Sequence, residues 1–175
     1  LTNGEGKVGI PIAVKMLQAR DSSLKIVEEG IKEVERTPFV RCVGLGGAPN
    51  FLGEVECDAG IMDGRTLQCG SVGALQGYIH AITVARAVME HLPHVFLVGK
   101  GAAQFAKEIG EKTTNLLTEE ALADYSNWIN KHIPKNLLES KHLSLLPYAN
   151  LSAKHNFAKG TTVFLVRDSN GNLAG

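Results

Sequence analysis

The pair Gly160-Thr161 stands where a polar stretch meets an apolar segment, and it offers the most distinctive chemistry in the sequence. If the bond between the two residues is cut, the hydroxyl of Thr161 becomes the nucleophile of an N-terminal residue. The freed α-amino group, with a reference pKa of about 7.7–8, can then accept the hydroxyl proton near neutral pH. In the uncut chain that nitrogen is an amide and no base. Most threonines before a strand cap that strand or satisfy a turn, so the local pattern alone carries little weight.

Histidines and cysteines give weaker patterns. His91 and His94 straddle the expected end of a helix, with Pro93 between them, so they do not face one way and do not indicate a metal site. The cysteines are odd in number and have no C-x-x-C spacing, which argues against a zinc site and a disulfide framework: Cys42, Cys57 and Cys69.

Two glycine-rich turns and two aspartates also have ordinary interpretations. Residues 43–50 are rich in glycine but lack the lysine and the spacing of a phosphate-binding loop, and 99–101 fits a turn from strand to helix. Asp58 and Asp63 are five residues apart, which places them on opposite faces of a strand. We therefore expect them to be exposed or to form turns.

The elements that must position Thr161 follow from the apolar spacing. Helices are expected over 10–19 and 24–34, with Asp21 or Ser22 as the cap of the second, and strands with tight turns over 43–77. Further along, the pattern predicts a helix over 82–89, a strand over 95–98, a short helix over 101–109 and a helix that starts after Thr118.

The last part of the chain is expected to carry the candidate nucleophile into a hairpin. Residues 134–160 show no sustained period and are interpreted as a long exposed connector, after which strands over 162–167 and 172–174 flank an Asn-Gly turn. Together the elements predict layered α/β packing in which the strand pairing is not all parallel.

The bulk properties bound the function. The 175 residues suffice for one compact domain, and a net charge of zero with 21% charged residues gives no basic surface for nucleic acid. No apolar run approaches the roughly 18–20 residues that span a bilayer, so no membrane partner is expected. A cytoplasmic location is expected, with a lysosomal or secreted one as the alternative because Asn150 begins an N-glycosylation sequon.

An ordered set of motifs resembles the α portion of the glycosylasparaginase and plant-type asparaginase (isoaspartyl peptidase) family of N-terminal-nucleophile hydrolases. The resemblance covers most of the chain. The motifs are VGLGGAPN at 43–50, GE at 53–54 leading through Asp58 to IMDG at 61–64, GSVG at 70–73, ARAVME at 85–90 and PHVFLVG at 93–99. The 43–50 loop is closer to the glycosylasparaginase branch.

The resemblance implies a fold and a set of site residues. The fold is the αββα sandwich, of which this chain would hold about half as a single domain: 1–160 resembles the α chain, with the 134–160 linker, and 161–175 the start of the β chain. The ungapped match of Asp168, Gly171 and the residues after it places the nucleophile at Thr161, with Gly160 donating the cleaved carbonyl. Val163 stands where the family commonly has glycine. Asn50 is expected near the active site or as a shaper of its turn.

The implied activity is hydrolysis of the side-chain amide of an asparagine derivative. The expected substrate is N4-(β-N-acetylglucosaminyl)-L-asparagine, with plain asparagine or β-aspartyl peptides as alternatives. No metal or organic cofactor is implied. The implied partners are the small-molecule substrate, a β-chain portion beyond Gly175, and a second processed protomer in a dimer. The competing interpretation is a truncated, non-catalytic half whose open sheet edge and apolar faces require that missing portion.

Overall fold

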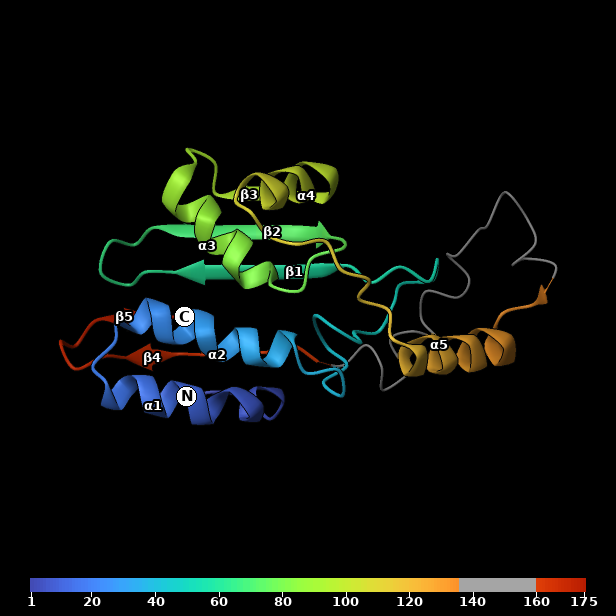
Figure 1. Ribbon diagram of the computed structural model, residues 1–175, viewed down its shortest axis with the longest axis horizontal. Helices are drawn as coiled ribbons and strands as arrows, with labels where there is room; N and C mark the ends of the chain where they lie inside the picture. The colour runs from blue at the N-terminus through green and yellow to red at the C-terminus, as the bar shows by residue number, and fades with distance from the viewer. Residues whose placement is uncertain (136–159) are drawn as a thin grey trace.

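The computed structural model describes residues 1–135 and 160–175, which form a mixed α/β arrangement (Figure 1). Its elements in chain order are the 3-10 helix η1 (Glu5–Gly9), α1 (Ile10–Gln18), α2 (Ser23–Glu35), β1 (Cys57–Met62), β2 (Cys69–Leu75), α3 (Ala81–His91), β3 (Phe96–Val98), α4 (Gly99–Glu108), α5 (Glu119–His132), β4 (Val166–Arg167) and β5 (Leu173–Ala174).

The strands pair in both directions, as the segregated pattern of helices and strands predicts. β1 is antiparallel to β2, β2 is parallel to β3, and β4 and β5 form an antiparallel hairpin. Backbone hydrogen bonds join this hairpin to the end of β1: the N–H of Met62 donates to the carbonyl of Gly175 at 2.7 Å, and that of Gly64 to the carbonyl of Leu173 at 2.8 Å. The end of the chain therefore continues the sheet beside β1.

Helices cover one face of these strands. In Figure 1, α2 lies over β4 and β5, α3 lies over β1 and β2, and α1 packs beside α2, in agreement with their contacts. The apolar faces of α2, α3 and the strands meet in a core that includes the fully buried side chains Ile26, Val34, Val72, Leu75, Ile82 and Val88. α5 lies at one end of the molecule, away from this layer.

Local sequence signals account for the helix ends. The Ser22 hydroxyl accepts a hydrogen bond from the N–H of Lys25 at 3.4 Å, and the Thr118 hydroxyl accepts one from Ala121 at 3.2 Å, so both expected caps are present. The helices predicted over 10–19, 24–34 and 82–89 are confirmed. The strand predicted over 95–98 and the short helix after it are confirmed as well. The two final strands are shorter than predicted but pair as expected.

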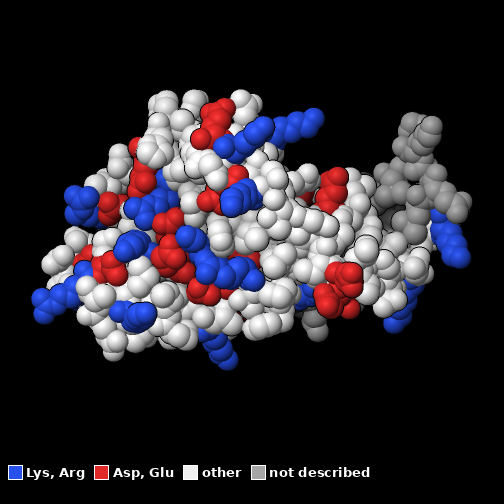
Figure 2. Space-filling view, viewed as in Figure 1, with Lys and Arg blue, Asp and Glu red and all other residues white. Residues whose placement is uncertain are grey.

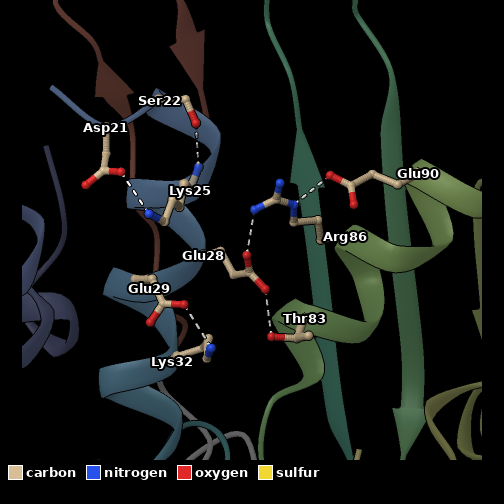
Figure 3. A network of polar contacts seen from close by, with 9 residues as sticks. All are labelled: Asp21, Ser22, Lys25, Glu28, Glu29, Lys32, Thr83, Arg86 and Glu90. Carbon is tan, nitrogen blue, oxygen red and sulfur yellow. Dashed lines mark hydrogen bonds and ion pairs between the residues drawn. The ribbon is translucent and has the colours of Figure 1, made fainter. Parts of the chain in front are cut away.

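A polar network ties α2 to α3 (Figure 3). Glu28, only 8% exposed, accepts hydrogen bonds from Arg86 Nη1 at 2.7 Å and from the Thr83 hydroxyl at 2.8 Å. Arg86 also donates through Nε to Glu90 at 2.7 Å. Because both oxygens of Glu28 accept a hydrogen bond and one of the donors is the Arg86 cation, the buried carboxylate is compensated. Elsewhere on this face, positive and negative side chains are interspersed (Figure 2).

The glycine-rich segment 43–56 forms tight turns, and regular strands begin only at Cys57, later than the prediction over 43–77 suggests. The reason is close backbone approach. Gly44 and Gly46 have φ of +67° and +75°, and a Cβ on Gly44 would lie 2.1 Å from the carbonyl oxygen of Glu35. These glycines bring the turn against the end of α2.

Two expectations fall where the structure gives no account. The connector expected over 134–160 lies almost wholly outside the described residues, as does the Asn150 sequon. Within the described residues, no helix has the length and apolarity needed to cross a membrane.

Candidate active site

Thr161 lies on a cavity of about 610 Å³ between the sheet and the end of α2. Gly160 and Thr162, the neighbours of Thr161 in the chain, line the same cavity. Both residues of the proposed scissile bond, Gly160 and Thr161, therefore lie on it. The opposite walls come from the first residues of β1, the middle of β2, the side chain of Phe96, and two residues of the loop after α2, Cys42 and Val43.

The segment after Thr161 is held by the first residues of the chain. Leu1 and Leu165 exchange backbone hydrogen bonds of 2.8 and 2.9 Å, and Thr2 bridges Phe164 in antiparallel register. The side-chain amide of Asn3 continues this pairing: its Oδ1 accepts from the N–H of Val163 at 3.3 Å, and its Nδ2 donates to the carbonyl of Thr161. Two segments far apart in sequence thus fix the backbone of the candidate nucleophile.

Phe164 anchors the same segment by packing. Its ring is 4% exposed and lies against three glycines, Gly6, Gly9 and Gly30, each too close to it to accommodate a Cβ. A Cβ on Gly30 would lie 2.7 Å from the ring, and one on Gly9 would lie 2.8 Å from it. Because Gly6, Gly9 and Gly30 have no side chains, η1 and α2 form a recess that holds the ring of Phe164, three residues after Thr161.

Asp168 locks the hairpin onto the start of α2. Its carboxylate accepts hydrogen bonds from the N–H of Ser23 at 3.2 Å and from the N–H groups of Asn170 and Asn172 at 3.0 and 2.9 Å. Burial by itself raises the pKa of Asp168, but these hydrogen bonds and the one from the Asn172 amide outweigh it, so the pKa is lowered overall. The negative charge also suits the N-terminal end of a helix.

Three carboxyl groups line the cavity: Glu35, Glu56 and Asp58. Glu35 is fully buried; its oxygens take the N–H of Ile82 at 2.9 Å and face His80 Nδ1 at 3.3 Å. Burial raises the pKa of Glu35, and the hydrogen bonds from His80 and Ile82 only partly oppose it. Glu35 therefore joins the end of α2 to the start of α3 at the back of the cavity.

Two thiols line the cavity, and neither is activated. Burial raises the pKa of Cys57 to about 11, which keeps it a protonated, unreactive thiol. Burial also raises the pKa of Cys42, reinforced by the negative charge of Glu5, although contact with the Thr162 hydroxyl opposes the shift. The two thiols are therefore poor nucleophiles, whereas three residues that line the cavity carry hydroxyl groups: Ser71, Thr161 and Thr162. Of these, Thr161 is the candidate that the sequence motif indicates.

The two aspartates considered from the sequence separate as expected. Asp63 forms a turn by accepting the N–H of Arg65 at 2.9 Å, whereas Asp58 is exposed on the cavity wall and accepts the N–H of Ala74 at 2.8 Å. Ala74 has φ +49° beside a register shift in the β1–β2 pairing, so Asp58 supports an irregular piece of β2.

Asn50 lies outside the residues that line the cavity. Its Oδ1 accepts the N–H groups of Leu52 and Glu54 at 2.8 and 3.1 Å, and its Nδ2 donates to Glu56 at 3.0 Å. Asn50 therefore shapes its own turn and touches the cavity only through Glu56, which is a wall residue.

The weaker sequence candidates take ordinary places. Gly99-Lys100-Gly101 opens α4 directly after β3, as a strand-to-helix turn does. His91 ends α3, and His94 lies beyond it, before β3. Across residues 1–135 and 160–175, no group of three or more histidine, cysteine or acidic side chains is arranged to hold a metal ion.

Sequence reasoning missed Asn3, Cys42, Glu35 and Phe164 as parts of the site. The contacts of Asn3, Cys42 and Phe164 join segments more than a hundred residues apart. Glu35 lines the cavity, and its side chain contacts residues 45 and 47 positions further along the chain. One signal was present: Gly30 interrupts an otherwise regular helical pattern, and an isolated glycine there often marks a close packing contact.

The mixed α/β arrangement is consistent with the class of N-terminal-nucleophile hydrolases that the motifs resemble. The family model described as asparaginase matches residues 9–175, nearly the whole chain. The chain belongs to this family, as the motif resemblance predicts.

Curated relatives bear similar names. An N(4)-(beta-N-acetylglucosaminyl)-L-asparaginase of Elizabethkingia miricola is 38% identical over 150 residues, which cover 86% of this chain and 44% of the relative. A plant-type L-asparaginase of Thermococcus kodakarensis is 41% identical over 123 residues, 70% of this chain and 39% of the relative. An N(4)-(beta-N-acetylglucosaminyl)-L-asparaginase of Rattus norvegicus is 39% identical over 115 residues, 66% of this chain and 33% of the relative. The chain thus spans less than half the length of these relatives.

Proposed function

We propose that this chain is part of an amidohydrolase that cleaves the side-chain amide of asparagine derivatives through Thr161. The observation that carries the proposal is the position of Gly160 and Thr161 together on one cavity. Its support is the family membership and the names of the relatives, two of which act on N4-(β-N-acetylglucosaminyl)-L-asparagine by their names and one on L-asparagine. The glycosylated substrate is the first choice, with asparagine and β-aspartyl peptides as alternatives.

Self-cleavage comes first in the proposed mechanism. The Thr161 hydroxyl attacks the carbonyl carbon of Gly160; a C–O bond forms, the Gly160–Thr161 C–N bond breaks, and the hydroxyl proton ends on the released nitrogen. Water then hydrolyses the ester, which leaves a carboxylate on Gly160 and a free amine on Thr161.

Turnover repeats this chemistry on the substrate. The α-amine of Thr161 takes the hydroxyl proton as the oxygen attacks the side-chain carbonyl carbon of the substrate, and the same proton passes to the leaving amine. Water hydrolyses the resulting acyl-enzyme and releases aspartate. Donors to the oxyanion are worth about 3–4 kcal/mol each in comparable sites, so they must be supplied near the cavity.

A further portion of the protein completes the site in this proposal. The described residues that line the cavity include three carboxyl groups but no lysine or arginine, so the α-carboxylate of a substrate needs a cation from elsewhere. Sheet register indicates where that portion would enter. Residues 62, 63 and 64 face 175, 174 and 173, so a strand continuing past Gly175 would run along Ile61 and then along Gly60 and Ala59, which line the cavity.

The complete fold proposed here is the αββα sandwich, of which the described residues supply one helical layer and its strands. Residues 1–160 would be the α-chain portion and 161–175 the start of the β chain, assembled as a dimer of processed protomers. The three cysteines are free thiols, which favours a reducing, cytoplasmic compartment. The mechanism uses no cofactor.

Two substitutions at Thr161 test this function in the full-length gene product. Thr161→Val keeps the side-chain volume but removes the hydroxyl, and should abolish both the cut after Gly160 and aspartate release from glycosylated asparagine. Thr161→Ser keeps the hydroxyl and should still be cut, as intact-mass measurements would show. Cleavage of Thr161→Val at the wild-type rate would refute the proposal. An intact wild-type mass that persists, without aspartate release, would favour the non-catalytic fragment.

A further inference from the structure

Gly160 lies directly against Cys42, a contact that the family comparison does not address. A Cβ built on Gly160 would stand 2.6 Å from the Cβ of Cys42 and 3.7 Å from its Cα and Sγ. Real Cβ atoms do not approach one another to 2.6 Å, so Cys42 occupies the space of a side chain at position 160. The contact is to the base of the cysteine side chain, which cannot rotate away as a flexible tip would.

The requirement for glycine at 160 is spatial. The three atoms nearest to a Cβ built on Gly160 all belong to Cys42, so an alanine at 160 would meet this side chain first.

The loop that carries Cys42 is held on both sides. The adjacent guanidinium of Arg41 donates to the carbonyl of Gly46 at 2.8 Å and pairs with Asp124 on α5. The carbonyl of Arg41 accepts the N–H of Ala48 at 3.0 Å. Because the loop closes on itself and on α5, Cys42 has little freedom to move away from residue 160.

Cys42 also lines the cavity on which the scissile bond lies, together with Gly160, Thr161 and Thr162. Its side chain therefore stands against the residue before Thr161 at the wall of the same cavity. A wall at this position restricts the positions that the Gly160 carbonyl can take relative to the Thr161 hydroxyl.

Given the proposed function, we propose that Cys42 is a positioning residue for self-cleavage. Its Cβ excludes any side chain at residue 160 and so holds the Gly160 carbonyl where the Thr161 hydroxyl attacks. Cys42 neither accepts a proton nor forms a bond in the reaction. Residues 42 and 160 are complementary in size: the absence of a side chain at 160 leaves the space that the Cβ of residue 42 fills.

A double-mutant cycle in the full-length gene product tests this complementarity. Gly160→Ala should slow the cut by roughly 10- to 100-fold, because overpacking and a displacement of about 1 Å have effects of that size. The slowing should persist in a Cys42→Ala background, which keeps the Cβ, and disappear in a Cys42→Gly background, which removes it. Each double variant is compared with its own Cys42 single variant, by the rate at which intact mass is lost.

A second measurement does not depend on the folding of the Cys42→Gly variant. Gly160→Cys, exposed to oxidised glutathione, should form a disulfide between the new thiol and Cys42 after a small local shift that brings the Cβ atoms to the roughly 3.5–4.5 Å a disulfide needs. The product loses two hydrogens to the oxidant, which is reduced to two glutathione thiols, and peptide mapping would locate the bond. Linkage of the new thiol to Cys57 or Cys69 instead would contradict the contact.

The outcomes separate this proposal from the proposed function. If the wild type is cut and Gly160→Ala is cut equally fast, the role of Cys42 is wrong while the function stands. Equal slowing by Gly160→Ala in the Cys42→Ala and Cys42→Gly backgrounds would likewise show that the role of Cys42 is wrong. If the wild type is never cut, the proposed function and the role of Cys42 are both wrong. If Gly160→Ala is cut at the normal rate only in the Cys42→Gly background, both are supported.

Discussion

Gly30 lies inside α2, and replacing it with alanine should destabilise the protein even though alanine is the better helix former. The cause is the Phe164 ring. A Cβ on Gly30 would lie 2.7, 3.0 and 3.2 Å from three carbons of that ring. Phe164 is 4% exposed and its ring also packs against Gly6 and Gly9, which leaves the ring little room to move away.

Two opposing effects set the magnitude. Alanine in a helix interior gains about 1 kcal/mol over glycine. An extra methyl group in a filled core costs about 1–3 kcal/mol. At 4% exposure Phe164 is in the core, so we take the upper half of that range, about 2–3 kcal/mol, and expect a net loss of about 1–2 kcal/mol in the free energy of unfolding. For a protein of this size that loss lowers Tm by roughly 2–8 °C.

Gly101 in α4 is the matched control, since nothing lies within 4 Å of a Cβ built there. Gly101→Ala should raise Tm in thermal unfolding followed by circular dichroism, so the two glycine substitutions should move it in opposite directions. Phe164→Leu should lower Tm less in the Gly30→Ala background than in the wild type, because the smaller side chain at 164 leaves space for the new methyl group at 30. Equal stabilisation by both alanines would refute the recess as the reason for Gly30.

Two further predictions concern charge. Burial raises the pKa of Asp168, but its hydrogen bonds lower the pKa by more than burial raises it, so the folded pKa is below the ordinary 3.8. The stability that the Asp168 carboxylate provides is therefore present above about pH 4 and is lost as pH falls through the folded pKa. Thermal unfolding of Asp168→Asn should accordingly depend less on pH below 4 than that of the wild type; an unchanged slope would contradict this. Arg86→Met removes the cation from buried Glu28 and should cost about 1–3 kcal/mol, whereas Lys25→Ala, at an exposed pair, should barely change Tm; equal shifts would argue against the burial effect.

The regular elements were predictable because their signals are local. Periods of three and four fixed the helices, and hydroxyl caps at Ser22 and Thr118 fixed where two of them begin. The Asn-Gly turn predicted the final hairpin. The delayed start of β1 was not predictable, because the turns over 43–56 depend on how close their glycines come to the end of α2 and to Pro38.

Of the residues at the candidate site, the sequence singled out only Thr161, the proposed nucleophile, together with Gly160 before it. Thr161 has a family motif around it, but its neighbours are brought together by long-range pairing, for which a single sequence gives no register. Asn3 has no local signal that it spans two backbone groups of the segment after residue 160. Glu35 reads as one of several acidic residues on an amphipathic helix until α3 packs over it.

The contacts around Thr161 also explain how a cut chain would keep its nucleophile in place. After cleavage, residues from 161 onward would be held only by non-covalent contacts, and three independent ones exist: pairing with residues 1–3, the Phe164 ring in its recess, and Asp168 at the start of α2. A fourth joins Gly175 to Met62. Since these contacts lie on both sides of the hairpin and involve none of the atoms that change in the cut, the new N-terminus would stay on the cavity where its chemistry is needed.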